Sequence, residues 1–498
     1  MSQDCAVAGL ADIWSECVRR FPNKTAAIAG EEVLTYSQAH ALAGSLASEL
    51  VGRLGLVRGG RVCICMRNSL EFYLAYWATH LAGGVVCGVS PRLGPRESGY
   101  VVRTSGAKIL FSDAAPPCEG SAIEHILGVE ELRAFCGRKA AVPDVAVGRG
   151  EDLAVLAHTS GTTGEPKISE VTHRDLLFNL RTAILAHSLR HEDVIVVGGP
   201  MFHCTPLYSL MPSAAYLGAS LVITPETSAA AQARVAADSH ATVWFGVPTL
   251  FHQLAAAAEP EKLDLACLRL IAYAGSPMRP ETIRRLSERW PHLALHNFFG
   301  LTETISMTHV LPAGDALERA DSVGKVLPEV FVRIMGEGGA EVKRGDVGEL
   351  CFHRRNVIRA YWGRPGLLEE SFDGDWFRTG DLAREDEDGY LYLQGRSKDM
   401  IIVSGENVYA AEVEGAIARC RGVADVAVVG IPATGVRASL GELVKAVVVR
   451  SAGSEIGELD VKRFCSRELA SYKVPHVVEF RDELPCNVTG KVLKEKLK

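Results

Sequence analysis

The strongest constraint on the fold is the alternation of short apolar runs with amphipathic stretches over the first two-thirds of the chain. Arg61–Met66 is a short apolar run, a helix is predicted over Leu70–Leu81, and a second apolar run follows at Val85–Val89. Strands that alternate with helices are typical of βαβ units and largely parallel sheets. Four further runs are expected to be strands: Val194–Val197, Leu221–Ile223, Thr242–Phe245 and Leu268–Tyr273.

From about Gly324 the pattern changes to shorter strands separated by turn residues, which predicts a more antiparallel, barrel-like section over 324–395. A small α+β pattern follows, with strands at 401–403, 426–430, 443–449 and 477–480 and helices from 410 and near 459–470. A chain of 498 residues is also too long for one compact core. We therefore predict an α/β protein with a large N-terminal domain (1–396) of stacked βαβ sheets plus the barrel-like section, and a small, mobile α+β C-terminal domain (397–498).

Charge and cysteine usage exclude several classes of protein. A net charge of -7 and a pI near 6.1 argue against nonspecific binding to nucleic acid or to an anionic membrane. The most apolar stretch, Leu74–Val89, is interrupted by His80, Gly83 and Gly84, so no membrane span is expected. The N-terminus lacks a signal-peptide pattern, and the 13 cysteines form no CxxC pair. A cytoplasmic protein with reduced thiols is the simplest account.

A glycine-rich loop follows the predicted strand Leu153–Leu156. Its sequence, Ser-Gly-Thr-Thr-Gly-Glu-Pro-Lys over 160–167, combines glycines, hydroxyls and one lysine. Glycine lets a backbone approach a ligand closely, and hydroxyls and N–H groups donate to phosphate oxygens. Taken alone, the loop fits a flexible surface segment as well as a phosphate site. The spacing excludes a standard P-loop, because GxxxxGK[ST] does not occur.

Further motifs accompany this loop in a fixed order. They are Ser90–Glu97 (the weakest), Pro200–His203, Asn297–Thr304, Thr379–Asp381, Gly395–Asp399, Ser404–Asn407 and Asn487–Lys491. Singly, each of them reads more simply as a turn, a cap or a linker. Together they resemble the adenylate-forming superfamily, which includes acyl-CoA synthetases, luciferases and the adenylation domains of peptide synthetases. The resemblance runs over nearly the whole chain, from about Asp12 to Leu497.

The resemblance implies a role for each motif. The loop would hold the ATP phosphates, the ring of Phe299 would pack on adenine, and Asp381 would bind the ribose hydroxyls. Glu303 would help to hold magnesium. The implied ATP- and AMP-binding residues are Thr159, Ser160, Gly161, Thr162, Thr163, Gly164, Lys167, Ser276, Asn297, Phe298, Phe299, Gly300, Thr302, Asp381, Arg396 and Lys491. The implied catalytic residues are Lys491, Thr302, Glu303 and His203.

The implied chemistry activates a carboxylic acid with ATP. The carboxylate attacks the α-phosphate, pyrophosphate leaves, and the acyl-adenylate is then attacked by a thiol. The cofactors implied are ATP, Mg²⁺ and CoA. Between the two steps the C-terminal domain would rotate about Lys398, replacing Lys491 by the thiol-tunnel residues Ser404, Gly405 and Glu406.

The candidate acyl pocket is small or apolar in character. Its residues are His203, Cys204, Phe245, Ala274, Gly275, Gly300 and Met307. Relatives that activate amino acids carry an aspartate after the pocket aromatic, whereas 202–207 contains no carboxylate. We expect a neutral, hydrophobic acid, whether aliphatic, aromatic or polycyclic.

Three positions depart from the family pattern. Ile168 stands where glycine is usual, Phe299 replaces tyrosine, and Cys486 replaces a basic residue. None of them removes a group that adenylation requires, but they leave the acceptor open. The acceptor is expected to be CoA, with a carrier-protein thiol or delivery to a partner enzyme as the alternative. The sequence also leaves the oligomeric state open, a homodimer included.

Overall fold

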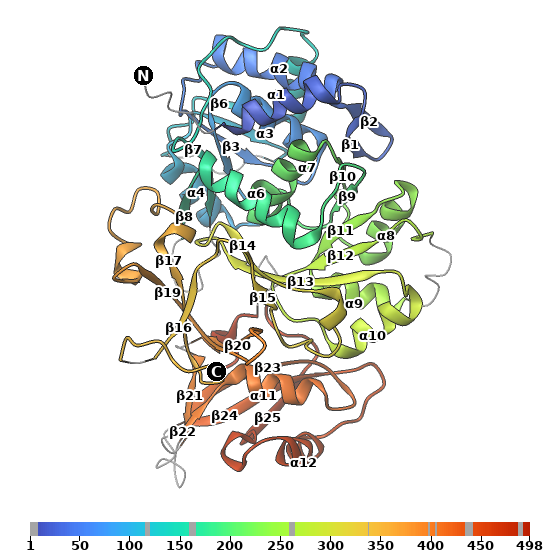
Figure 1. Ribbon diagram of the computed structural model, residues 1–498, viewed down its shortest axis with the longest axis vertical. Helices are drawn as coiled ribbons and strands as arrows, with labels where there is room; N and C mark the ends of the chain where they lie inside the picture. The colour runs from blue at the N-terminus through green and yellow to red at the C-terminus, as the bar shows by residue number, and fades with distance from the viewer. Residues whose placement is uncertain are drawn as a thin grey trace. The chain divides into compact units, whose positions relative to one another are not determined.

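The computed structural model describes residues 8–114, 120–158, 166–257, 264–336, 338–396, 399–403, 406–433, 442–486 and 492–498, without the side chains of Ser306, Glu406 and Asn407 (Figure 1). The chain divides into two compact units. Unit 1 comprises 1–320, 327–330 and 354–370, and unit 2 comprises 321–326, 331–353 and 371–498. The predicted domain boundary after Arg396 stays a prediction.

The larger sheet of unit 1 is mostly parallel. Its strands within unit 1, in spatial order, are β14 (Ser306–Leu311), β13 (Ala294–Leu301), β12 (Leu270–Tyr273), β11 (Val243–Gly246), β9 (Val194–Val197), β10 (Ser220–Ile223), β1 (Thr25–Ala29) and β2 (Glu32–Thr35). The pairs from β13 through β1 are parallel, whereas β13 with β14 and β1 with β2 are antiparallel. The carboxyl ends of β9, β11, β12 and β13 therefore share one edge of this sheet.

The second sheet of unit 1 runs in the order β6 (His125–Leu127), β5 (Ile109–Ser112), β3 (Arg61–Cys65), β4 (Val85–Gly88), β7 (Leu153–His158) and β8 (Ile168–Thr172). All its pairs are parallel except β7 with β8, which are antiparallel. The glycine-rich loop connects this antiparallel pair. β8 therefore starts directly after Lys167.

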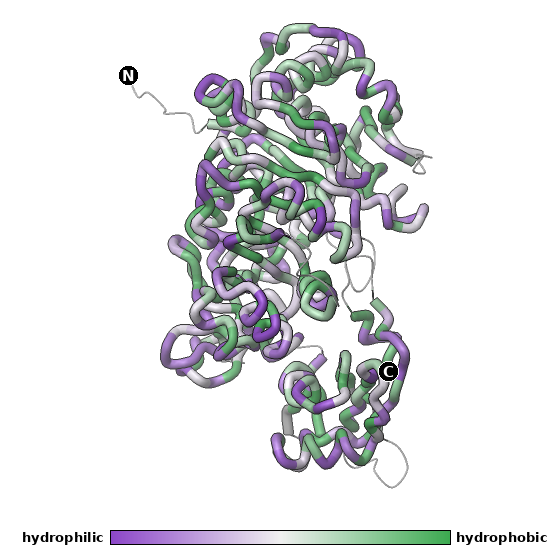
Figure 2. The backbone as a smooth tube through the Cα atoms, turned by 90° about the vertical axis from the view of Figure 1, so that its right-hand side faces the viewer, coloured by the Kyte–Doolittle hydropathy of each residue, from purple (hydrophilic) through white to green (hydrophobic). Residues whose placement is uncertain are grey.

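Helices join these strands. They are α1 (Leu10–Arg20), α2 (Tyr36–Gly52), α3 (Leu70–Leu81), α4 (Pro95–Ser105), α5 (Val129–Cys136), α6 (His173–His187), the π-helix η1 (Thr205–Leu210), α7 (Met211–Leu217), α8 (Ala229–Asp238), α9 (Pro248–Ala256) and α10 (Pro280–Arg289), with 3₁₀ turns η3 (Ala313–Asp315), η4 (Arg354–Asn356) and η5 (Glu369–Ser371). The Ser69 hydroxyl caps α3 by accepting from the Phe72 N–H at 3.1 Å, and every residue of α3 is buried. Short hydrophobic segments (green) and hydrophilic segments (purple) alternate along the backbone in Figure 2.

Unit 2 contains an antiparallel sheet made of β16 (Val332–Met335), β17 (Gly348–His353), β18 (Phe372–Asp373), β19 (Trp376–Glu385) and β20 (Leu391–Arg396). Its remaining elements are β15 (Lys325–Val326), β21 (Ile401–Val403), β22 (Glu406–Val408), α11 (Ala410–Ala418), β23 (Val423–Pro432), β24 (Glu442–Arg450), α12 (Glu458–Glu468), β25 (Val477–Arg481), and the turns η8 (Ser471–Lys473) and η9 (Lys494–Lys496). A common core joins α11 and α12 to β23, β24 and β25.

The predicted fold class is confirmed: a mixed α/β protein with a large N-terminal body of sheets and a smaller C-terminal one. The apolar stretch Leu74–Val89 proves to be the end of α3 and then β4, as its glycines indicated. Across the described residues, no helix combines the length and hydrophobicity that crossing a bilayer requires.

Candidate active site

The shared carboxyl edge of the larger sheet of unit 1 gathers the candidate pocket residues. Phe245 is the last residue but one of β11 and Phe298 lies in β13, with ring centroids 5.8 Å apart. Met307 in β14 pairs in register with Gly300, and all three side chains are buried. In parallel α/β sheets, ligands bind outside the carboxyl ends of the strands. The structure thus brings the apolar members of the predicted pocket together at a suitable edge.

A pair of histidines, His187 and His296, lies next to these two phenylalanines. The His187 ring meets Phe245 edge-on at 5.0 Å and Phe298 at 5.3 Å, and its Nδ1 lies 3.2 Å from Nδ1 of His296. Burial holds the pKa of His187 well below its usual range and lowers the pKa of His296 to about 4. Both imidazole rings are therefore neutral at physiological pH, so these histidines add no charge next to Phe245 and Phe298.

The loop after β12 contributes the small residues of the pocket. Ala274 is half-buried, while Gly275 and Ser276 are exposed. Gly275 has φ of +95°, a left-handed conformation that a side chain would strain. The chain can therefore turn sharply at the end of β12, next to the edge where β11 and β13 end.

His203 and Cys204 stand at the start of an irregular helix. The His203 side chain is exposed, Cys204 is buried, and the Cys204 Sγ lies 3.3 Å from the His203 Nδ1. The next residues form the π-helix η1, which contains Pro206. Short π segments occur often at functional sites. The element predicted to border the acyl pocket thus has an unusual backbone.

A strained turn carries Thr302 and Glu303. Ile305 has φ of +60°, which is unfavourable for a β-branched residue. The Asn179 amide donates to the Ile305 carbonyl at 2.5 Å, and the Ser209 hydroxyl donates to the Asn179 Oδ1 at 2.6 Å. Buried contacts from α6 and η1 therefore hold the turn in place, and strain of this kind clusters at active sites. Sequence reasoning missed Asn179, because nothing local marks it.

Glu303 and Lys167 meet the same side chain. The Tyr361 hydroxyl donates to the Glu303 Oε1 at 2.7 Å, and the Lys167 Nζ lies 4.8 Å from the Tyr361 ring centroid. Tyr361 is buried, with 4% of its surface exposed. Burial and the nearby Glu303 carboxylate raise the pKa of Tyr361, which keeps the phenol a donor. Sequence reasoning missed this residue also, since it lies 58 positions after Glu303.

Other residues of unit 1 that are predicted to bind the nucleotide lie on β13. Asn297 is buried, and the Phe299 ring is half-buried at 5.9 Å from the His309 ring. Burial lowers the pKa of His309 to about 3, so this neighbour is neutral. Stacking of Phe299 on adenine stays a prediction.

The predicted ribose-binding carboxylate, Asp381, lies in unit 2, on the β-hairpin formed by β19 and β20. Asp381 of β19 pairs in register with Arg396 of β20, and the Arg396 Nε lies 2.6 Å from the Asp381 Oδ1. Gly380 has φ of +74°. The Asp381 N–H donates to the Thr379 hydroxyl at 3.0 Å, which in turn donates to the Leu350 carbonyl at 2.7 Å. The predicted ribose-binding aspartate and its arginine neighbour are thus one ion pair on a rigid hairpin.

Several predicted residues lie outside the described part of the chain. They are Thr159, Ser160, Gly161, Thr162, Thr163, Gly164, Lys398, Ser404, Gly405 and Lys491. Glu406 is described only as backbone, in β22. The roles assigned to these residues stay predictions.

Magnesium fits the donor set of unit 1. Mg²⁺ is bound through one or two carboxylates together with substrate phosphates and water, and not by a cage of protein ligands. Glu303 offers one carboxylate, which accepts a hydrogen bond from a neutral donor, the Tyr361 hydroxyl. Within the described residues no group of three or more metal-ligating side chains occurs. A single carboxylate of this kind fits a magnesium ion that arrives with a nucleotide.

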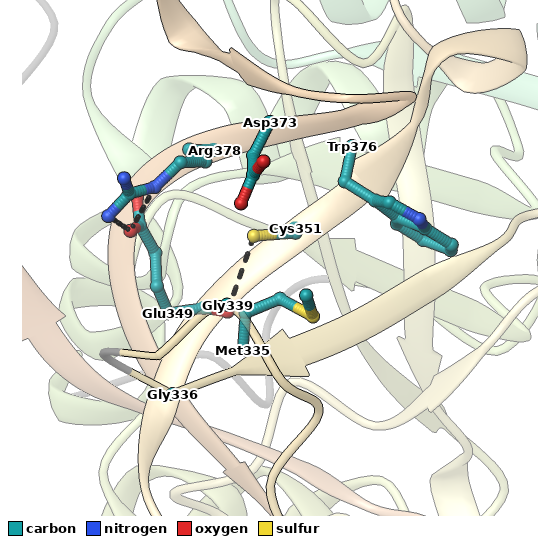
Figure 3. A pocket seen from close by; sticks show the side chains of 8 residues that line it. All are labelled: Met335, Gly336, Gly339, Glu349, Cys351, Asp373, Trp376 and Arg378. Atoms are coloured by element: carbon teal, nitrogen blue, oxygen red, sulfur yellow. Dashed lines mark hydrogen bonds and ion pairs between the residues drawn. The ribbon is translucent and has the colours of Figure 1, made fainter.

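A small cavity in unit 2 does not coincide with these residues (Figure 3). It measures about 50 Å³ and is lined by Met335, Gly336, Gly339, Glu349, Cys351, Asp373, Trp376 and Arg378. This volume holds a few water molecules, whereas ligand pockets measure about 300–1,000 Å³. The cavity is therefore a packing gap in the antiparallel sheet.

The chain matches known proteins over its length. A family described as AMP-binding enzyme matches residues 14–362, and the AMP-binding enzyme C-terminal domain matches residues 412–491. The long-chain-fatty-acid–CoA ligase FadD13 of Mycobacterium tuberculosis is 31% identical over 479 residues, covering 93% of this chain and 92% of the relative. A feruloyl-CoA synthase of Amycolatopsis sp is 33% identical over 482 residues, covering 96% of each protein.

A solved structure agrees with these relatives. The crystal structure of the anthranilate CoA ligase AuaEII in complex with anthranoyl-AMP superposes with a TM-score of 0.90 at 25% identity, over 99% of this chain and 97% of that one. The long-chain, hydroxycinnamic and anthranilic acids named for these three proteins differ widely in shape. All three proteins act on an acid and CoA.

Proposed function

The chain belongs to the AMP-binding enzyme family and is an acyl-CoA synthetase, and we propose that its substrate is a neutral, hydrophobic carboxylic acid. One observation carries this proposal: the rings of Phe245 and Phe298 lie 5.8 Å apart at the carboxyl edge of the larger sheet, Met307 is buried on β14, and the neutral His187 ring contacts both phenylalanines. A charged group on the acid would lose its hydration there without gaining a partner. An acyl chain or an aryl ring would bury apolar surface.

The reaction has two steps. A carboxylate oxygen of the acid attacks the α-phosphorus of ATP, the bond from that phosphorus to the oxygen bridging the α- and β-phosphates breaks, and pyrophosphate leaves. The CoA sulfur then attacks the acyl carbonyl of the acyl-adenylate, and AMP leaves while the thiol proton passes to solvent. Both steps bring anions together, so the site must supply positive charge and donors where charge develops.

We propose that unit 1 grips the phosphates. Lys167 supplies a fixed positive charge, and the loop 159–164 before it supplies hydroxyl and backbone donors. Thr302 donates to the α-phosphate, from the turn that Asn179 holds in place. Glu303 binds magnesium, which lowers the repulsion between the phosphates and the attacking carboxylate.

We propose that unit 2 holds the ribose and supplies the mobile groups. Asp381 accepts from the ribose hydroxyls while Arg396 balances its charge. Lys491 bridges the carboxylate and the α-phosphate in the first step. For the second step the chain turns at Lys398, which removes Lys491 and brings Ser404, Gly405 and Glu406 to the thiol.

We also propose a cytosolic setting. The described cysteines, among them Cys63, Cys87 and Cys351, are all free thiols. Persistent free thiols suit a reducing compartment. A homodimer is compatible with this setting, and size-exclusion chromatography with light scattering tests it.

The experiment that tests the function is a panel of acids. Pyrophosphate exchange is measured with long-chain fatty acids, hydroxycinnamic acids, anthranilate and amino acids, and thioester formation is then measured with CoA. We expect exchange and acyl-CoA formation with one hydrophobic class and none with amino acids. Exchange without acyl-CoA would refute CoA as the acceptor and point to a carrier-protein thiol. Exchange with amino acids only would refute the acid class.

A further inference from the structure

The short segment 358–362 joins two parts of the phosphate site. On one side, the Ile358 N–H donates to the Glu303 carbonyl at 2.8 Å. On the other side, it pairs with β8 directly after Lys167: the Glu170 N–H donates to the Ala360 carbonyl at 3.0 Å. We call residues 358–362 the crosspiece. It belongs to unit 1, although unit 2 residues flank it on both sides in the sequence.

Other contacts fix the crosspiece in place. The Trp362 N–H donates to the Ile168 carbonyl at 2.7 Å, and the Trp362 indole donates to the Thr104 carbonyl at 2.9 Å. The Arg359 guanidinium lies 3.1 Å from the Glu170 carboxylate, whose side chain is 13% exposed. The Ser169–Tyr361 bridge completes the pairing with β8. The backbone of Tyr361 is thus held independently of its side chain.

The Tyr361 hydroxyl has an unusual acceptor, a carboxylate in place of a backbone carbonyl. Tyr36, which is also buried, donates to the backbone carbonyls of Ala214 and Ala219 at 3.0 and 2.6 Å. Tyr361 instead donates to a carboxylate, and the ammonium of Lys167 approaches its ring. A phenol that donates to a carboxylate fixes its orientation without cancelling its charge. The ring attracts the ammonium electrostatically.

We propose that Tyr361 is a positioning residue that orients the Glu303 carboxylate for magnesium and at the same time holds the phosphate-binding Lys167. This inference rests on the proposed function, since it takes Glu303 as the magnesium ligand and Lys167 as a phosphate ligand. One side chain thereby couples the two charges that meet the nucleotide. Each is arranged before the ligand arrives, which lowers the cost of ordering them on binding.

The two contacts can be separated by substitution. Tyr361→Phe removes the hydroxyl that orients Glu303 but keeps the ring beneath Lys167. Tyr361→Leu removes both. Tyr36→Phe is the matched control, because it also deletes one buried tyrosine hydroxyl but lies far from Glu303 and Lys167 in the sequence and contacts neither.

The test measures binding of ATP and of Mn²⁺ to the full-length protein, without the acid. Mn²⁺ stands in for magnesium and is followed by electron paramagnetic resonance in the presence of ATP. For Tyr361→Phe we expect the Mn²⁺ dissociation constant to rise about 5- to 10-fold, with metal-free ATP affinity within 2-fold of wild type. For Tyr361→Leu we expect the same rise and, in addition, a 5- to 10-fold loss of metal-free ATP affinity. Tyr36→Phe should change neither.

Two outcomes would overturn the proposal. One is a Tyr361→Phe protein with the Mn²⁺ affinity of the Tyr36→Phe control. The other is an equal loss for Tyr361→Phe in the wild-type and in the Glu303→Gln background, since a hydroxyl that acts through Glu303 should have no effect once that carboxylate is gone. Circular dichroism checks folding, and the double substitution decides the matter if Tyr361→Phe is unstable.

A different result would refute the proposed function. If the wild-type protein binds Mn²⁺ and ATP but shows no pyrophosphate exchange with any acid, the proposed function is refuted, while the binding test still decides the role of Tyr361. If the wild-type protein binds neither, both proposals are refuted together.

Discussion

The two carboxylates assigned to the nucleotide are held in contrasting ways. In unit 1, Glu303 accepts from the neutral phenol of Tyr361. In unit 2, Asp381 is paired with the guanidinium of Arg396 at 2.6 Å. A neutral donor leaves a full negative charge for a cation, whereas an ion pair leaves an acceptor with little net charge, suited to neutral hydroxyls. The partner of each carboxylate is therefore consistent with the ligand proposed for it: a metal ion for Glu303 and a sugar for Asp381.

Removing the charge of Glu303 tests the first half of this contrast and should have the largest effect. For Glu303→Gln we expect acid-dependent pyrophosphate exchange to fall about 10³-fold, roughly 4 kcal/mol, because the metal loses its protein ligand. The magnesium concentration for half-maximal exchange should rise at least 10-fold by the same reasoning. An unchanged magnesium requirement would remove Glu303 from the metal site.

The two units should also differ in their stability at acidic pH. The histidines whose pKa values are lowered by burial lie in unit 1 in the described chain; among them are His173, with a pKa of about 4, and His309, with a pKa of about 3. Because these values lie below that of the unfolded chain, about 6.5, the neutral rings stabilise unit 1 above pH 6.5. That contribution, about 3 kcal/mol for His173 and about 5 kcal/mol for His309, is lost progressively as the pH falls from 6.5 through the folded-state pKa values of about 4 and about 3.

Limited proteolysis at pH 7 and pH 4.5 checks this prediction. Unit 1 fragments should be cut before unit 2 fragments at the lower pH. His309→Gln, which cannot be protonated, should weaken the pH dependence. If unit 2 is cut first in acid, groups other than these histidines control acid unfolding.

Asp381→Asn tests the second half of the contrast. The amide keeps the shape but loses the charge-assisted hydrogen bonds to the ribose, so kcat/KM for ATP should fall about 30-fold, roughly 2 kcal/mol. The half-saturating magnesium concentration should stay within about 2-fold of wild type, because Arg396 already balanced this charge. A large shift in magnesium dependence would show that the two carboxylates share one ligand.

The smallest effect is expected at Glu170, which supports the crosspiece. Its pair with Arg359 is partly exposed, so Glu170→Gln should cost about 0.2–1 kcal/mol, a change of at most about 5-fold in magnesium-dependent exchange. Glu281→Gln on α10 breaks a more exposed Glu–Arg pair, with Arg285, and serves as the control. An effect as large as that of Glu303→Gln would mean that Glu170 itself meets the nucleotide.

Local pattern predicted the elements well. The helix predicted over Leu70–Leu81 and the strands at Val194–Val197 and Ile401–Val403 have those bounds in the structure. Hydrophobic periodicity and turn residues are local signals, because each depends only on residues a few positions apart. A single sequence therefore suffices to predict these elements. The C-terminal α+β pattern also agrees, with α11 beginning at Ala410 and β25 at Val477.

The contacts of the site could not be predicted in this way. The motifs named Lys167 and Glu303, but the side chain between them, Tyr361, comes from a segment with no motif of its own. The positive φ of Ile305 runs against the preference of a β-branched residue, so sequence reasoning argues against it. Tertiary contacts from Asn179 over 126 positions impose that conformation. Long-range contacts of this kind are set by the whole fold.

The return of residues 354–370 to unit 1 has a consequence for biosynthesis. A nascent chain that has emerged only to residue 320 lacks the last strip of the unit and, with it, Tyr361. At about 5–20 residues per second, the ribosome needs several more seconds to supply it. Until then the segment that pairs with β8 is missing, and the predicted phosphate site lacks Tyr361. The time spent translating this stretch therefore adds to the time for which unit 1 stays incomplete.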